Sequence, residues 1–171
     1  MTRAAVVALL IAPTARADDP KKKPAKNEPQ AQEKMEKGGA VFITPDALKW
    51  GEPPPDVPKG AKLAVLYGDP SKPGMFTMRI KAPDGYKIPA HWHSNDEHLT
   101  IISGTLQMYM GDTMTGEPHK LTAGSYHFLP AKMHHGAQTK GETIVQVSGP
   151  GPFDIHYINP ADNPNPKSAK R

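Results

Sequence analysis

Short runs of apolar and β-branched residues, each closed by Gly, Pro, Asp or Ser, fill the chain from residue 62 to residue 158. Between them no segment carries the 3.6-residue apolar spacing of an amphipathic helix. Many evenly spaced short strands without intervening helices are typical of all-β sandwiches and barrels. The predicted strands are Leu63–Tyr67, Met75–Lys81, Lys87–His93, Glu97–Ser103, Thr105–Met110, Ser125–Leu129, His134–Thr139, Thr143–Ser148 and Phe153–Ile158.

Two histidines lie two residues apart on one of these predicted strands. Because side chains alternate along a strand, His91 and His93 leave the same face, with their Cα atoms roughly 7 Å apart. Residues 94–96 are Ser, Asn and Asp, a turn-forming triplet, so the next strand can fold back and bring Glu97 opposite the two imidazoles. Two imidazoles and a carboxylate suit a divalent transition metal, whether Mn, Fe, Co, Ni, Cu or Zn. A third imidazole from a distant strand would complete such a site.

The spacing around these residues follows a known pattern. From Gly85 to Gly104 the sequence has Gly, five residues, His-X-His, three residues, Glu, six residues and Gly. At every fixed position this segment resembles the first conserved motif of the cupin superfamily. The resemblance extends over residues 63–158, a little over half of the chain.

A second cupin motif is met in part. Gly124, Pro130 and His135 stand at its fixed positions, whereas Lys132 replaces its second Gly and Thr139 replaces its Asn. A Gly at the position of Lys132 usually serves a backbone shape that a Cβ atom disfavours, so the turn before His135 is the uncertain part of the match. His135 itself stands at the spacing that the motif has for its metal-binding histidine.

The resemblance implies a fold and a ligand set. In cupins the two motifs lie on strands of a small jelly-roll barrel, and their three histidines and one glutamate bind a metal inside it. Carried over to this sequence, the implied ligands are His91, His93, Glu97 and His135. More loosely, the chain is similar to exported bacterial proteins with a single cupin domain and no assigned role.

The remaining histidines are weaker candidates. His98 and His134 are the sequence neighbours of predicted ligands, so strand alternation directs them to the outer face. His119 lies in the connection between the motifs, where exposure is expected. His127 can face the cavity only if its aromatic neighbours, Tyr126 and Phe128, face outward, and the sequence leaves both arrangements open.

The two ends differ in composition from the middle. Residues 1–17 combine a basic start at Arg3, an apolar run and small residues before a cleavage site after Ala17, which predicts a signal peptide and a periplasmic or secreted protein. A strand at residues 40–43 is expected to open the ordered domain. The predicted organisation is a signal peptide over 1–17, a disordered Lys/Pro/Glu-rich spacer over 18–37, a cupin β-barrel over 38–160 and a flexible tail over 161–171.

Charge and hydropathy exclude two classes of partner. The formal net charge is +4, but the excess of Lys and Arg lies in the two ends, which argues against a nucleic-acid face. No apolar run is long enough to span a bilayer, and the chain has no Cys for a disulfide or a lipid anchor. Cupins often pair through barrel edges, so a homodimer in which residues 40–44 add a strand to a second copy is compatible with the sequence.

Two functions are consistent with the predicted site. The first is a metalloenzyme of the oxygenase, oxidase or isomerase type that acts on a small oxygenated molecule at open metal positions. The alternative is a non-catalytic module that binds or senses a metal or a small molecule. The catalytic residues stay unknown, because Tyr126, His127 and Glu142 are unranked candidates for an acid or base. A structural zinc site is disfavoured, because such sites usually use Cys or close around the ion.

Overall fold

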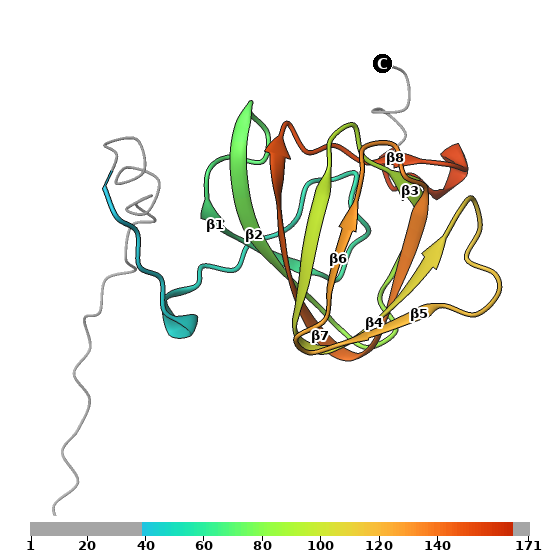
Figure 1. Cartoon of the computed structure of the whole chain (residues 1–171), viewed down its shortest axis with the longest axis horizontal. Helices are drawn as coiled ribbons and strands as arrows, with labels where there is room; N and C mark the ends of the chain where they lie inside the picture. The colour runs from blue at the N-terminus through green and yellow to red at the C-terminus, as the bar shows by residue number, and fades with distance from the viewer. Residues whose placement is uncertain (1–38, 166–171) are drawn as a thin grey trace, which may run out of the picture.

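The computed structural model describes residues 39–165 of the 171-residue chain. The predicted signal peptide, the predicted spacer and the last residues of the predicted tail therefore lie outside the described residues. The described part is almost entirely strand, with two single-turn 3₁₀ helices, η1 (Pro45–Ala47) and η2 (Pro160–Asp162). The predicted all-β barrel is confirmed (Figure 1).

Eight strands form the sheet. They are β1 (Lys62–Tyr67), β2 (Gly74–Ala82), β3 (Lys87–Trp92), β4 (Glu97–Met110), β5 (His119–Thr122), β6 (Tyr126–Leu129), β7 (His135–Gly151) and β8 (His156–Tyr157). β4 and β7 each join two of the predicted strands into one continuous strand. β5 is absent from the predicted set, because its sequence HKLT lacks an alternating apolar pattern.

β7 organises the barrel because it pairs along its length with three other strands. β2 pairs with its second half, β3 pairs with its first half, and β4 runs antiparallel to both halves. β5 and β6 complete the structure by pairing with β4, and β8 pairs with β3. All of these pairs are antiparallel, and the strands close around a common interior (Figure 1).

The last glycine of the first motif allows β4 to bend where it runs beside β7. Gly104 has a φ of +79°, in the left-handed region that disfavours residues with a Cβ atom. A Cβ atom there would collide with the carbonyl oxygen of Glu142 and the hydroxyl of Thr143. The register of the β4–β7 pair shifts on either side of this position, so the strand curves without ending.

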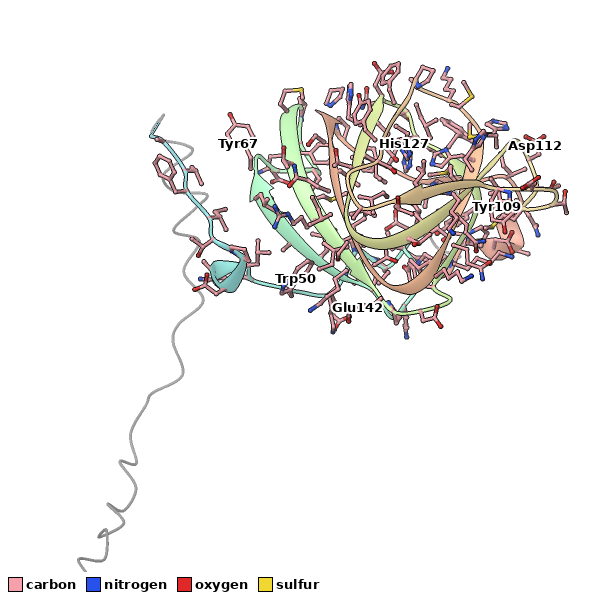
Figure 2. All side chains as sticks on the ribbon, turned by 60° about the horizontal axis from the view of Figure 1, so that its bottom comes forward. Trp50, Tyr67, Tyr109, Asp112, His127 and Glu142 are labelled. Atoms are coloured by element: carbon pink, nitrogen blue, oxygen red, sulfur yellow. The ribbon has the colours of Figure 1, made fainter. Side chains whose placement is uncertain are left out.

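The core lies inside the barrel, where side chains of β2, β4 and β7 meet (Figure 2). Strand alternation sends every second residue inward, as in Leu106 and Met108 of β4 and Val145 and Val147 of β7. The cluster of buried residues consists of Phe76, Met78, Leu99, Ile101, Leu106, Met108, Ala137, Val145 and Val147.

The segment before β1 differs from the prediction. Residues 40–43 form no strand, and the Phe42 side chain is 92% exposed, because no neighbouring strand offers this segment a partner. Further along, residues 51–60 form a proline-rich segment, and Gly51 bridges to Leu63, which ties this segment to β1. In the part of the chain that the structure describes, no helix has the length and apolar character needed to cross a membrane.

Candidate metal centre

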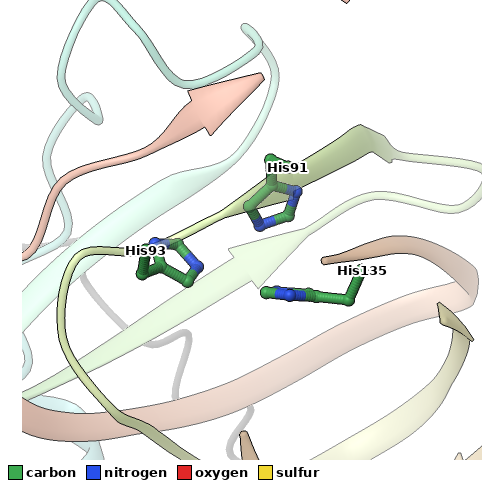
Figure 3. Close-up of side chains that lie close together, drawn as sticks. All are labelled: His91, His93 and His135. Carbon is green, nitrogen blue, oxygen red and sulfur yellow. The ribbon is translucent and has the colours of Figure 1, made fainter. Parts of the chain in front are cut away.

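Three histidines on or directly next to two strands meet inside the barrel (Figure 3). His91 is on β3, His93 follows directly after β3, and His135 begins β7, where it pairs in register with His91. All three are buried, and one ligand nitrogen from each lies within 4.8 Å of the others. The ring centroids are 4.2 Å apart for His91 and His135, 4.9 Å for His91 and His93, and 5.3 Å for His93 and His135.

Backbone carbonyls fix the orientation of all three rings. Nδ1 of His91 is 2.7 Å from the oxygen of Pro89, and Nδ1 of His135 is 2.9 Å from the oxygen of Met133. Nδ1 of His93 is 2.5 Å from the oxygen of Asp154. A carbonyl only accepts, so each Nδ1 carries the proton and donates it. In His91 and His135 the lone pair is therefore on Nε2, the tautomer in which a metal-binding histidine is usually held. Nε2 of His93 also donates, to the carboxylate of Glu97 at 2.9 Å, so a metal would have to displace that proton.

The carboxylate of Glu97, the first residue of β4, lies beside this cluster. Its Oε2 is 2.9 Å from Nε2 of His93 and 3.9 Å from Nε2 of His135. Burial favours the neutral acid, but hydrogen bonds from His127 and His93 outweigh burial and hold the pKa of Glu97 well below its usual range. Glu97 is therefore a buried anion next to three imidazoles.

The electrostatics of the cluster keep two of the three imidazoles neutral. Burial lowers the pKa of His91 well below its ordinary value, and the charges of His135 and His93 add to that effect. Burial also lowers the pKa of His135, although Glu97 opposes it. For His93 burial acts in the same direction, but the hydrogen bond and charge of Glu97 prevail and raise its pKa. Neutral imidazole is the form that binds a metal.

The turn before His135 adopts a left-handed backbone conformation at Lys132, where the motif has glycine. Lys132 has a φ of 65° and is the one described residue other than glycine with a positive φ. Its backbone N–H donates to the carbonyl of His93 at 2.8 Å, which links the two motifs directly. Thr139, at the position of the family's Asn, accepts from the N–H of Tyr86 at 2.9 Å and donates to the carbonyl of Pro83 at 2.5 Å.

His127 is the functional residue that the sequence left open. Its Nε2 lies 2.8 Å from Oε1 of Glu97, and its side chain is 11% exposed. Its aromatic neighbours face outward, with Tyr126 55% and Phe128 48% exposed. The structure therefore selects the inward arrangement for His127, and this side chain holds the second oxygen of the predicted ligand Glu97.

His98, His119 and His134 lie on the outside as predicted. His98 hydrogen-bonds the hydroxyl of Tyr126 at 2.6 Å on the outer surface. His134 pairs with Asp112 at 2.6 Å, and His119 is exposed. Of the unranked acid or base candidates, exposed Glu142 lies at the edge of the barrel away from His127 (Figure 2), so only His127 reaches the cluster.

The donor set fits a divalent transition metal. Three imidazoles and a carboxylate, all buried, are costly to fold unless a cation or hydrogen bonds compensate them. His91, His93, Glu97 and His135 all line a cavity of about 370 Å³, whose walls are otherwise mainly apolar. A cation at this cluster would meet nitrogen and oxygen ligands suited to Mn, Fe, Co, Ni, Cu or Zn.

Solved structures with the same fold confirm the expected resemblance. The polyketide cyclase RemF from Streptomyces resistomycificus aligns with a TM-score of 0.63 at 14% identity, covering 77% of this chain and 94% of its own. An RmlC-like cupin from Shewanella frigidimarina has a TM-score of 0.51 at 19% identity, covering 64% and 88%. A candidate acetylacetone dioxygenase from Methylibium petroleiphilum has a TM-score of 0.57 at 20% identity, covering 74% and 85%. At these identities the likeness shows the fold alone.

No curated protein matches the sequence. One protein-family model, described as "Domain of unknown function (DUF4437)", matches residues 7–156, which is most of the chain. The match includes both cupin motifs and every predicted ligand. The chain therefore belongs to this DUF4437 family and has the cupin fold.

Proposed function

We propose that the protein is a metal-dependent cupin enzyme of the oxygenase, oxidase or isomerase type, acting on a small oxygenated molecule. The ligands in this proposal are His91, His93, Glu97 and His135. The observation that carries it is the set of three buried imidazoles whose Nδ1 atoms are fixed by carbonyls while a nitrogen of each ring faces a common centre. These residues line a cavity large enough for a small molecule.

The chain's own residues supply the ligands, their orientation and a dry site. The carbonyls of Pro89, Asp154 and Met133 hold the rings in place, and His127 holds the carboxylate of Glu97. A divalent metal bound there would act as a Lewis acid toward an oxygen atom of a bound molecule. Apolar side chains around the cavity exclude water, which strengthens every electrostatic interaction in the site.

By analogy, two structural neighbours support the proposal that the cavity binds a small molecule. They are described as a polyketide cyclase and a candidate acetylacetone dioxygenase, and both names refer to reactions of small organic oxygen compounds. A shared fold alone does not transfer an activity, so this analogy supports the class of molecule and leaves the reaction open.

The test is a metal analysis followed by turnover assays. The full chain, purified without a metal-binding tag, should contain about one transition-metal ion per chain. His91→Ala should lose most of that metal, whereas His98→Ala, which removes an outward histidine, should keep it. The loaded protein is then screened with diketones, phenols and hydroxy acids for oxygen consumption and, by mass spectrometry, for products.

The outcomes separate the two functions. Turnover that disappears in His91→Ala and persists in His98→Ala supports the enzyme. A loaded protein that binds these molecules tightly and converts none of them supports the non-catalytic module. A preparation that takes up no metal even from a Co²⁺ or Zn²⁺ solution contradicts the enzyme and the metal-binding form of the module.

A further inference from the structure

Most of the cavity wall outside the histidine cluster is apolar. Side chains from β1, β2, β4 and β7 cover it with aliphatic carbon and thioether groups. The residues that matter here are Leu63, Met78, Leu99, Leu106, Val145 and Val147. The volume of about 370 Å³ is in the lower part of the range for small-molecule sites, roughly 300–1,000 Å³.

The hydroxyls of the two threonines that line the cavity are already in use. Thr139 accepts from the N–H of Tyr86 and donates to the carbonyl of Pro83. Thr143 accepts from the N–H of Thr105 at 3.1 Å and donates to the carbonyl of the same residue at 3.1 Å. Both side chains therefore serve the barrel backbone, and neither has a donor left for a ligand.

The charges around the cavity have one sign. Among the described residues that line it there is neither Lys nor Arg, and the charged groups are the carboxylates of Glu97, Asp56 and Asp154. The Asp154 carboxylate is bound to the N–H of Ser94 at 2.8 Å and to its hydroxyl at 2.6 Å. An anionic group on the body of a ligand would lose its hydration without gaining a partner.

We propose that the natural ligand is a mainly apolar molecule with a single oxygen-rich head group, which lies at the histidine cluster, and a body without anionic groups. This inference rests on the proposed function and narrows its substrate class. Sugars, sugar phosphates and dicarboxylates are excluded by it, because each needs polar partners away from the head group. Alkyl or aryl compounds with one chelating oxygen pair fit it.

The test uses three hydroxamic acids that share one metal-binding head group. Acetohydroxamic, benzohydroxamic and 4-carboxybenzohydroxamic acid are titrated into the Co²⁺-loaded full chain by isothermal calorimetry. Burial of the phenyl ring should make benzohydroxamic acid bind at least about tenfold more tightly than acetohydroxamic acid. The carboxylate of 4-carboxybenzohydroxamic acid should abolish this gain in affinity.

Neighbouring residues of β7 provide a matched pair of variants. Val145 is buried and lines the cavity, whereas Ile144 is half-buried and is not among its lining residues. Val145→Phe should weaken benzohydroxamic acid about tenfold or more and leave acetohydroxamic acid nearly unchanged, and Ile144→Phe should change neither. If Val145→Phe does not fold, Leu63→Phe tests the same cavity wall, because Leu63 is a half-buried residue of β1 that also lines the cavity.

Each contrary result has its own meaning. Equal affinities for the acetyl and benzoyl compounds, or a tighter fit of the carboxylated one, overturn the apolar ligand class while the metal site stands. A loaded protein that binds none of the three also overturns it. A chain that holds no Co²⁺ overturns the proposed function, and this inference falls with it.

Discussion

Nε2 of His127 lies 2.8 Å from Oε1 of Glu97, and the other oxygen of the same carboxylate lies 2.9 Å from Nε2 of His93. Glu97 is therefore held from one side by a histidine outside the predicted ligand set and faces that set with its second oxygen. Metal ligands commonly depend on such an outer partner, whose loss lowers metal affinity about 10–100-fold. His127 is accordingly a positioning residue for Glu97.

His127→Phe should lower the affinity for Zn²⁺ about tenfold or more, because one oxygen of the buried carboxylate loses its donor. His127→Gln keeps a donor and should recover most of the affinity. Competition with a chromophoric chelator measures both variants. Equal losses in the two variants would indicate a packing defect, and wild-type affinity in His127→Phe would refute the positioning role.

Two adjacent histidines test the register of the second motif. His135→Ala should remove most of the bound metal, since this side chain belongs to the buried cluster. His134→Ala should keep it, because His134 pairs with Asp112 at the surface. Metal content per chain, measured by elemental analysis, distinguishes them, and the reverse order would mean that the ligand after Pro130 is misassigned.

The strained turn before His135 makes a stability prediction. Lys132 has a φ of 65°, a conformation that costs a residue with a Cβ atom roughly 1–2 kcal/mol. Glycine avoids this cost, but part of the gain in stability is lost because glycine gives the unfolded chain more conformational freedom. Lys132→Gly should therefore stabilise the fold by about 0.5–1 kcal/mol. Lys132→Ala removes the same charge and keeps the strain, so its urea midpoint should stay near that of the wild type. Equal midpoints for the Gly and Ala variants would contradict the strain.

Two tyrosines connect the barrel to the proline-rich segment and predict an alkaline loss of stability. Tyr86 donates its hydroxyl to the carbonyl of Pro58, and Tyr157 donates to that of Asp56. Burial raises the pKa of Tyr86 from 10.0 to about 12 and also raises the pKa of Tyr157. Because the folded pKa of Tyr86 is the higher one, its contribution is complete below pH 10 and declines as the pH rises toward about 12.

Urea unfolding between pH 9 and pH 11.5, at roughly half-unit steps, measures this decline. Tyr86→Phe should be less stable than the wild type at pH 9 and should lose less stability over the alkaline range. A variant whose curve runs parallel to that of the wild type would show that Tyr86 does not contribute to the pH dependence.

The parts of the fold that follow local rules could be predicted from the sequence. Strand alternation placed His91 and His93 on one face, and the motif glycine at residue 104 marked a position where a Cβ atom does not fit. The continuity of β4 through Gly104 was not predicted, because a glycine inside an apolar run looks the same whether it bends a strand or ends it.

What could not be predicted depends on partners distant in sequence. Apolar pattern alone would bury Tyr126 and Phe128, yet both are exposed and His127 is inside, because Glu97 on the neighbouring strand offers it a buried charge. Residues 40–43 have strand-forming composition but no partner strand, so they stay irregular. A short strand such as β5 is defined by its pairing with β4 more than by its own residues.

The most direct test of the metal centre is anomalous diffraction from crystals of the full chain grown with Co²⁺. The account predicts one strong peak about 2.0–2.2 Å from Nε2 of His91, His93 and His135 and from an oxygen of Glu97. A barrel with these four side chains in place and no peak among them, or a peak only at surface histidines, would contradict it.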